Sequence, residues 1–302
     1  MSASVWRAGR FEIDLERPRV MAIVNVTPDS FSEVDAAATP SQAIARCERL
    51  LAEGADLLDI GGESTRPGAP EVDAATELAR VVPVLRAAVR MGCPVSIDTS
   101  KAEVMRAALD VGADIVNDVG ALRGPGSLDV VAAHGACGVC LMHMRGTPET
   151  MREAARYDDV VAEVAAFLRE RIAAAEAAGI ARERIVADPG IGFAKSFEHN
   201  VALLARQESL AKLGVPLLVG WSRKSTLARL AGVGTAAPDR SDAERARVVA
   251  ASVAAAVLAV ERGARVVRVH DVAATVAGLA VWQASHRADN RGDLSSDRRS
   301  TS

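Results

Sequence analysis

Eight short apolar runs, each followed within three residues by polar side chains, constrain the fold of this chain more than any other feature. The runs lie at residues 20–24, 57–60, 95–97, 115–116, 139–142, 185–187, 217–219 and 266–267. A strand that is buried on both faces of a parallel sheet reads as an apolar run. In a barrel of eight such strands, the reactive groups lie at the carboxyl ends of the strands. We therefore expect the polar residues after the runs to form one site.

The length and the spacing of the runs fit a single barrel. The chain has 302 residues, and an eight-unit barrel typically takes about 250 residues plus insertions. Helical patterns between the runs predict helices at residues 40–53, 73–91, 101–111, 158–178, 241–262 and 272–285. Strands that alternate with helices predict an α/β chain folded as a (β/α)8 TIM barrel.

Both ends of the chain carry further predictions. Residues 5–15 alternate around a turn, which predicts an N-terminal β-hairpin across the barrel's N-terminal mouth. Apolar residues nearly vanish over residues 286–302, which predicts a disordered tail. We expect a single domain over residues 1–285.

Composition excludes several classes of protein. The 36 basic and 39 acidic residues leave a net charge of -3 without a long block of one sign, so neither nucleic acid nor a membrane surface is an expected partner. No apolar run approaches the roughly 18 residues of a membrane span, and no signal-peptide core is visible, which favours a cytoplasmic location. Cys137 and Cys140 have redox-motif spacing but lie in an apolar run, which favours packing.

The alternation of side chains along a strand predicts an acidic and amide pocket. Residues two apart share a face, so Asp98, Asn117 and Asp188 are expected to meet in the top layer of the barrel. Carboxylates and an amide are costly to bury unless a ligand satisfies them. A heterocycle with several N–H donors is such a ligand, because an ionised carboxylate can accept two of them.

Basic side chains predict an anion site beside this pocket. They are Arg66, Lys224, Arg268 and His270. Arg223 and Lys224 also precede a predicted helix, whose dipole disfavours cations at that end. An anionic ligand such as a phosphate would resolve the conflict.

Each of these residues also has a structural alternative. Asp98 could cap the next helix, and Asn25 and Asp188 could be turn residues before prolines. His270 could be a satisfied strand-end histidine. In residues 142–144 the alternation places two methionines on one face and the histidine on the other, which favours packing over metal binding. The functional interpretation rests on the eight strand ends taken together.

The strand ends resemble the motifs of dihydropteroate synthases. The matching segments are Asn-Val-Thr-Pro-Asp-Ser-Phe at 25–31, Gly-Gly-Glu-Ser-Thr-Arg-Pro-Gly at 61–68, Ser-Ile-Asp-Thr-Ser-Lys at 96–101, Asn-Asp at 117–118, Leu-Met-His-Met at 141–144, Asp-Pro-Gly-Ile-Gly-Phe at 188–193, Gly-Trp-Ser-Arg-Lys-Ser at 220–225 and Arg-Val-His-Asp-Val at 268–272. They stand in the family's order and cover residues from about 20 to 285. The first two segments are the most specific.

The resemblance implies a transferase of tetrahydrofolate biosynthesis. It would join p-aminobenzoate to 7,8-dihydropterin-6-ylmethyl diphosphate, giving 7,8-dihydropteroate and pyrophosphate by a dissociative mechanism. Mg²⁺ would assist as cofactor, sulfonamides would compete with p-aminobenzoate, and the enzyme would be a homodimer.

The resemblance also implies roles for individual residues. The catalytic residues would be Asp98, Asp188, Lys224 and Glu33, and the pterin would be bound by Asp98, Asn117, Met142, Asp188, Phe193, Lys224 and Arg268. The diphosphate would be bound by Asn25, Arg268 and His270, with the metal at Asn25. The aminobenzoate would be bound by Phe31, Thr65, Arg66, Pro67, Phe193, Lys224 and Ser225.

The chain departs from the family's motifs at two places. Ser-Glu-Val-Asp at 32–35 replaces the usual Ser-Asp-Gly-Gly, so Glu33 is one methylene longer and two loop glycines are missing. Ala194 replaces the second glycine of Gly-Phe-Gly-Lys, which matters if its φ is positive. A pterin-binding paralogue with weak or no synthase activity is therefore an alternative, as is a non-catalytic pterin-binding protein. The segments at 65–67 and 222–225 fit the synthase better than the related corrinoid-pathway methyltransferases.

Overall fold

Eight parallel strands close into a barrel in the described part of the chain, in the order β10-β3-β4-β5-β6-β7-β8-β9. The computed structural model describes residues 4–27, 39–64, 69, 71–147, 150–151, 154–234 and 240–296, with side chains up to residue 287. The strands are β3 (Arg19–Asn25), β4 (Leu57–Gly61), β5 (Val95–Asp98), β6 (Ile115–Asp118), β7 (Gly138–Met142), β8 (Ile185–Asp188), β9 (Leu217–Val219) and β10 (Ala264–Val269). The predicted TIM barrel is confirmed. The polar residues Asn25, Asp98, Asn117, Asp188 and Arg268, which follow the apolar runs, lie within the strands themselves.

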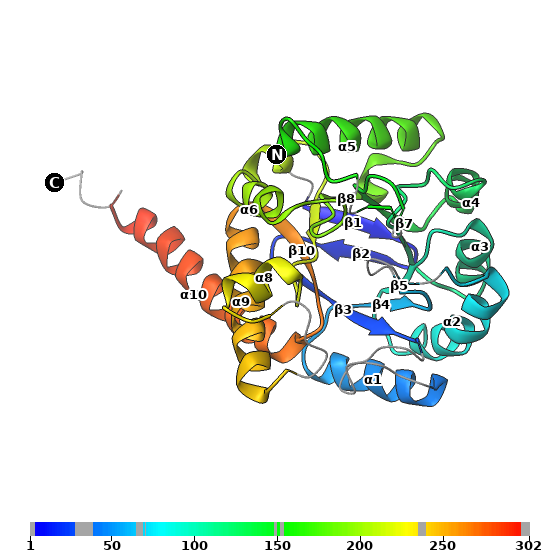
Figure 1. Cartoon of the computed structure of the whole chain (residues 1–302), viewed down its shortest axis with the longest axis horizontal. Coiled ribbons are helices and arrows are strands. Elements are labelled where there is room, and N and C mark those ends of the chain that lie inside the picture. The colour runs from blue at the N-terminus through cyan, green and yellow to red at the C-terminus, as the bar shows by residue number, and fades with distance from the viewer. Residues whose placement is uncertain are drawn as a thin grey trace.

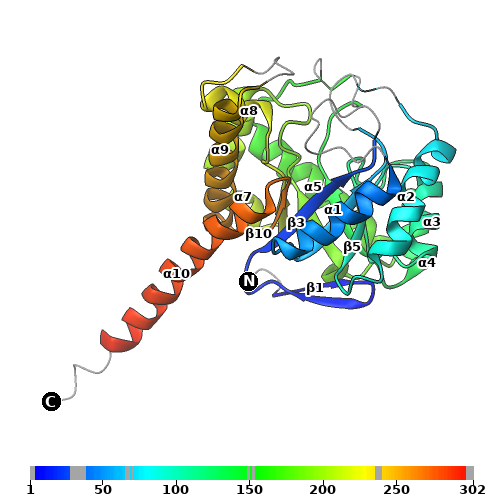
Figure 2. The ribbon, with the colours of Figure 1, turned by 90° about the horizontal axis from the view of Figure 1, so that it is seen from below.

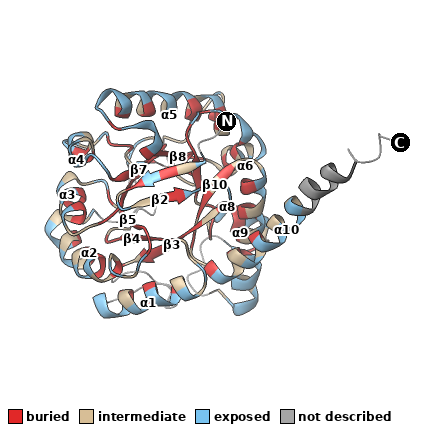
Figure 3. Cartoon of the chain, turned by 180° about the vertical axis from the view of Figure 1, so that it is seen from behind, coloured by how far each residue is buried: buried red, intermediate tan, exposed pale blue. Residues whose placement is uncertain are grey.

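Helices surround the barrel (Figure 1). They are α1 (Pro40–Ala52), α2 (Ala74–Ala88), α3 (Ala102–Asp110), α4 (Ser127–His134), α5 (Val160–Ala177), α6 (Phe197–Ala205), α7 (Glu208–Ala211), α8 (Ser225–Leu230), α9 (Asp242–Glu261) and α10 (Val272–Ser296), with a 3₁₀ turn η1 (Arg182–Arg184). Figure 3 shows the buried strands inside a ring of helices whose outer faces are exposed. The capping boxes at Thr39 and Ser241 begin α1 and α9 where the sequence predicts them.

The predicted N-terminal hairpin covers the end of the barrel at which the strands begin (Figure 2). It consists of β1 (Val5–Ala8) and β2 (Phe11–Asp14), which pair antiparallel. Trp6 is fully buried against the lowest inward side chains of the barrel, and its Nε1 donates to the carbonyl oxygen of Arg184 at 2.9 Å. The hairpin therefore closes the bottom and leaves the carboxyl ends of the strands as the open face.

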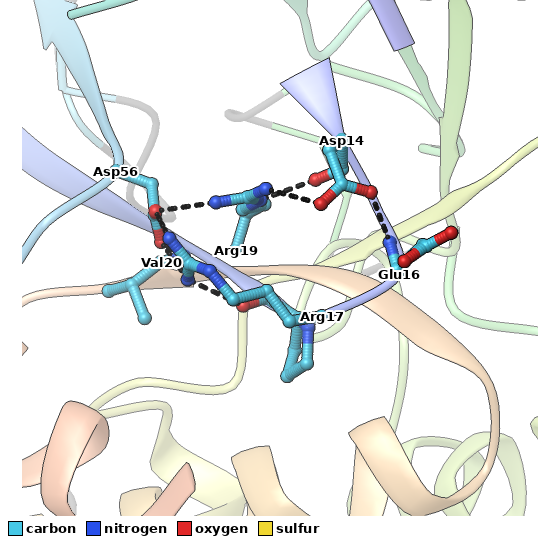
Figure 4. Close-up of polar contacts among 7 residues, drawn as sticks. Asp14, Glu16, Arg17, Arg19, Val20 and Asp56 are labelled. Atoms are coloured by element: carbon cyan, nitrogen blue, oxygen red, sulfur yellow. Dashed lines mark hydrogen bonds and ion pairs between the residues drawn. The ribbon is translucent and has the colours of Figure 1, made fainter. Parts of the chain in front are cut away.

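Ion pairs fasten the hairpin to the first two barrel strands (Figure 4). Asp56 lies just before β4, and its Oδ2 accepts the Val20 backbone N–H at 2.9 Å. Its carboxylate also pairs with Arg17 and Arg19. Arg19 in turn pairs with Asp14 at the end of β2, at 3.1 Å. These contacts link β2, β3 and the start of β4 at the closed end.

The last helix differs from its prediction. α10 runs from Val272 to Ser296, so the predicted end at residue 285 is wrong and the first part of the predicted disordered tail is helical. The prediction relied on apolar periodicity, whereas a helix that is already nucleated can extend through polar residues. Residues 297–302 lie outside the described residues. No helix in the described chain is both long and apolar enough to cross a membrane.

Candidate active site

The inner face of the barrel changes from apolar to polar within two residues along β4, β6, β8 and β10. The lower inward side chains are Met21, Leu57, Ile115, Cys140, Val186, Leu218 and Val266, which pack under the hairpin. Two positions further along the same strands stand Ile23, Asp59, Asn117, Met142, Asp188, Gly220 and Arg268. Because alternate residues share a face, one layer of the barrel is sealed core and the next is a functional surface.

A pocket opens above this layer. It is lined by Ile23, Asp98, Asn117, Val119, Met142, Asp188, Ile191, Phe193, Gly220, Ser222, Lys224, Arg268 and His270. The predicted meeting of Asp98, Asn117 and Asp188 is thus confirmed. Asn25 ends β3 half-buried, and Ser225 begins α8 exposed, and neither lines the pocket. The predicted residues Phe31, Glu33, Thr65, Arg66 and Pro67 lie outside the described residues.

Arg268 joins two carboxylates at the floor of the pocket. Its Nε donates to Asp59 Oδ2 at 2.6 Å, and its Nη2 donates to Asp98 Oδ2 at 2.5 Å. Asp59 Oδ2 also accepts Asn117 Nδ2 at 3.0 Å. The carboxylates therefore have a basic partner inside the pocket. The prediction that Arg268 belongs with the cations of a separate anion site beside the pocket is wrong.

The charges at this floor influence one another. Burial raises the pKa of Asp98 to about 7, although Arg268 lowers it, and Asp59 raises it further. Burial opposes the charge on Arg268, but Asp59 and Asp98 outweigh it and raise the pKa of the guanidinium. The ion pair with Arg268 therefore favours the charged form of Asp98 in a place where burial opposes it.

Sequence reasoning missed Asp59, which is fully buried. It lies within the run 57–60, which was interpreted as an apolar strand, so its charge was overlooked. The available signal was its charge, because an aspartate is almost never fully buried unless it is paired. Asp98 does not cap α3 with its side chain, since the N-cap of that helix is Lys101.

Asp188 is both a turn residue and a pocket residue, the two roles that the sequence allowed. Its Oδ1 accepts the Gly190 backbone N–H at 2.7 Å, as in a turn, and its side chain also lines the pocket. Burial raises the pKa of Asp188 to about 6, opposed by the Gly190 N–H and by the charge of Lys224. The Lys224 Nζ lies 4.2 Å from the centre of the Phe193 ring, which is a cation–π contact at the edge of the pocket.

Arg223, one of the two cations before α8, is compensated within the chain. Arg223 Nε donates to Asp271 Oδ2 at 2.9 Å, and its Nη2 donates to Oδ1 at 2.5 Å. The dipole conflict at Arg223 is therefore relieved by Asp271, and that observation no longer requires an anionic ligand.

His270 is not a cation in this environment. Burial, Arg223 and Arg268 lower its pKa well below the usual value. Its backbone N–H donates to Ser222 Oγ at 3.1 Å, and its Nδ1 lies 3.1 Å from the same oxygen. The prediction of His270 as a basic partner is wrong, and the satisfied strand-end histidine is the better description, although the ring still lines the pocket.

A second network of charged side chains, which the sequence did not predict, follows the ends of β4 and β5. Lys101 Nζ bonds Glu63 Oε2 at 2.7 Å and Glu77 Oε2 at 2.9 Å. Glu63 Oε1 accepts the Val72 backbone N–H at 2.7 Å. These bonds hold together the two ends of the segment 64–71 that follows β4.

Structural packing explains the remaining sequence candidates. Cys137 and Cys140 are buried free thiols. Met142 and Met144 join one apolar cluster, while His143 packs edge-on against Phe167 at 4.8 Å between ring centroids. The packing predictions are confirmed at these positions.

Ala194 occupies a left-handed backbone conformation with φ of 50°. The replacement of the family's glycine by Ala194 therefore matters, because the φ angle at this position is positive. A side chain with a Cβ pays about 1 kcal/mol in this region relative to its ordinary conformations. The Ala194 methyl group is buried in the cluster of Met142 and Met144, which offsets part of that strain.

Comparison with known proteins connects the pocket to one family. The family model described as pterin binding enzyme matches residues 21–270. The dihydropteroate synthase of Neisseria meningitidis serogroup B is 50% identical over 289 residues, which cover 94% of this chain and 98% of the relative.

Two solved structures extend this similarity to the fold. Xanthomonas albilineans dihydropteroate synthase with 4-aminobenzoic acid is 54% identical with a TM-score of 0.82, covering 91% of this chain and 95% of that one. Yersinia pestis dihydropteroate synthase in a sulfonamide drug complex is 43% identical with a TM-score of 0.86, covering 94% and 99%.

The turn after β8 gives a test of how tightly the site is built. Gly190 has φ of 66°, and a Cβ there would lie 2.0 Å from the carbonyl oxygen of His143. Gly135 has φ of 73° with no atom within 4 Å of its Cβ position. We expect Gly190→Ala to lower the free energy of unfolding by about 1–3 kcal/mol more than Gly135→Ala, because only the first adds a clash to the backbone strain. Equal losses in urea denaturation would show that the turn can move.

Proposed function

The chain belongs to the dihydropteroate synthases within the pterin-binding enzymes, and we propose that the pocket at the open end of its barrel is where the reaction takes place. In that reaction p-aminobenzoate and 7,8-dihydropterin-6-ylmethyl diphosphate give 7,8-dihydropteroate and pyrophosphate. The observation that carries the assignment is the layer of buried carboxylates and amide at the pocket floor.

The pterin fits the hydrogen-bonding capacity of this floor. Asp98 lines the pocket, and its Oδ1 is buried without a hydrogen-bond partner among the described residues. Buried acceptors without partners cost free energy, so a ligand that donates to them gains. A pterin presents several N–H donors on one edge. Asp98, Asn117, Met142 and Asp188 would hold it, with Phe193, Lys224 and Arg268 around it.

The diphosphate belongs at the rim. Asn25 ends β3 on the open face of the barrel, and Lys224 supplies a cation there. Arg268 is engaged with Asp59 and Asp98, which supports its pterin-binding role more than its diphosphate-binding role. Neutral His270 would contribute a hydrogen bond.

Mg²⁺ is the proposed cofactor. In proteins it is often held by one or two side-chain oxygens together with substrate phosphates, and the Asn25 amide oxygen is such a ligand. Among the described residues there is no group of three His, Cys, Asp or Glu side chains that could hold a metal, so Asn25 and the diphosphate are the fitting ligand set. When bound, the ion would neutralise charge on the diphosphate oxygens and favour release of pyrophosphate.

The residues contribute positioning and electrostatics to the chemistry. The C–O bond between the pterin methylene and the diphosphate breaks first, and pyrophosphate leaves with the electron pair. Asp98 and Asp188 stabilise the cation that the pterin ring delocalises. The arylamine nitrogen of p-aminobenzoate then bonds to the methylene carbon and releases a proton to solvent. An arylamine is already a nucleophile, so its orientation by Phe193, Lys224 and Ser225 is the main requirement.

The aminobenzoate subsite is proposed from the sequence motifs and the family. Phe31, Glu33, Thr65, Arg66 and Pro67 would complete the aminobenzoate subsite, where sulfonamides would compete. A homodimer and a cytoplasmic location also remain proposals.

A direct assay tests the function. Purified protein with Mg²⁺, the pterin diphosphate and labelled aminobenzoate should form labelled dihydropteroate. Removal of Mg²⁺ by a chelator should slow the reaction. If pterin binds but no product forms, the synthase assignment fails and the paralogue or binding-protein alternative takes its place.

The raised pKa of Asp188 predicts a pH-dependent pterin affinity. Because that pKa is about 6, the ionised acceptor is lost as the pH falls through 6. Only about one tenth remains at pH 5, so calorimetry with 6-hydroxymethylpterin should show about tenfold weaker binding at pH 5 than at pH 8.

Asp188→Asn is the matched control for this titration. It should weaken binding at pH 8 by about 1.5–3 kcal/mol, the value of a charged hydrogen bond, and should remove the part of the pH dependence centred near 6. A dependence that comes from Asp98, whose pKa is raised by burial, should persist. Identical profiles for the two proteins would contradict the role of Asp188.

A further inference from the structure

A buried lysine behind the pocket holds the turn that follows β8. Lys195 is 9% exposed. Its Nζ donates to the carbonyl oxygens of Gly190 and Phe193, each at 2.9 Å. The same nitrogen lies 2.9 Å from Nδ1 of His143 and 3.4 Å from its carbonyl oxygen. These contacts are all to neutral groups, and they join both ends of the turn to the end of β7.

This arrangement is costly for an ammonium group. Burial lowers the pKa of Lys195 to about 7, while Asp188 raises it, and Lys224 and Arg145 lower it. Burial and the nearby Lys195 lower the pKa of His143 to about 2, so its ring is a neutral acceptor. An apolar side chain would fill the same space without this cost. The presence of a lysine therefore points to a need for its N–H donors.

The backbone of the turn explains that need. Gly190, Gly192 and Ala194 have φ of 66°, 81° and 50°, so the segment can join neither a helix nor the sheet ladder. Buried carbonyl oxygens outside such ladders require other donors. Lys195 supplies them to Gly190 and Phe193, while Asn200 Oδ1 accepts the Gly192 N–H at 2.8 Å.

The turn carries part of the pocket wall. Asp188, Ile191 and Phe193 all line the pocket, and the Phe193 ring lies under Lys224 Nζ. The Nζ of Lys195 bonds the backbone of Phe193 itself. A shift of this backbone would displace the ring that faces the second substrate.

From these contacts we propose that Lys195 is a positioning residue for the reaction, which fixes the 190–194 turn so that Phe193 is placed against the aminobenzoate. The inference rests on the proposed function. Lys195 itself lies behind the turn, and it acts through the backbone that it binds.

The experiment compares two buried cations of the same kind. Arg184 is 5% exposed, and its guanidinium donates to the carbonyl oxygens of Cys137 and Val131 at the closed end of the barrel. Lys195→Met and Arg184→Met should both lower the thermal midpoint. Only Lys195→Met should raise the KM for aminobenzoate, by about tenfold or more, since misplacement by about 1 Å costs up to 100-fold. Lys195→Gln, which keeps two donors, should recover part of the loss.

Wild-type activity in the same assay separates this inference from the proposed function. If the wild type makes no dihydropteroate, the function fails. If it does, the inference is overturned by a folded Lys195→Met with a KM within about twofold of the wild type, or by an equal rise in Arg184→Met. Failure of both Lys195 variants to fold while Arg184→Met folds would also overturn it, because the role of Lys195 would then be stability alone.

Discussion

The ion pairs of Arg268 with Asp59 and Asp98 are the interaction on which the rest of the site depends. Three charged groups stand together at the floor of a pocket that is otherwise enclosed by the barrel. Burying such groups costs desolvation that their mutual attraction only partly repays. Asp98 and Arg268 line the pocket at the open end, where a ligand can reach them, and the opposite end is sealed with apolar side chains and the hairpin. A purely structural barrel would have no reason to bear this cost.

The side chains around the pocket floor show the same division between an apolar closed end and a polar open end. Below it, Trp6 and the inward side chains of the strands form a dry core. Above it, the buried Lys195 supports the turn after β8, which carries part of the pocket wall. Stability is thus concentrated at the closed end, and specific polar contacts at the open end.

The sequence predicted the barrel, the hairpin and the meeting of Asp98, Asn117 and Asp188, because strand periodicity and chain order determine which side chains share a face. It did not predict partners between strands. Asp59 was hidden inside an apolar run, and Arg223 was expected to need an anion although Asp271, 48 residues away, already supplies one. His270 was expected to be charged, but its burial keeps it neutral. These outcomes depend on three-dimensional distances and on desolvation, which a linear pattern does not contain.

Pterin affinity of Asp59→Asn measures how far binding depends on the charged floor, because Asp59 bonds both Arg268 and Asn117. Calorimetry with 6-hydroxymethylpterin at pH 8 should show binding weaker by about 1.5–3 kcal/mol, roughly ten- to 150-fold, in a variant that still unfolds cooperatively. Affinity unchanged from the wild type would contradict the dependence of binding on these ion pairs, because the pocket would then bind pterin without the charged floor.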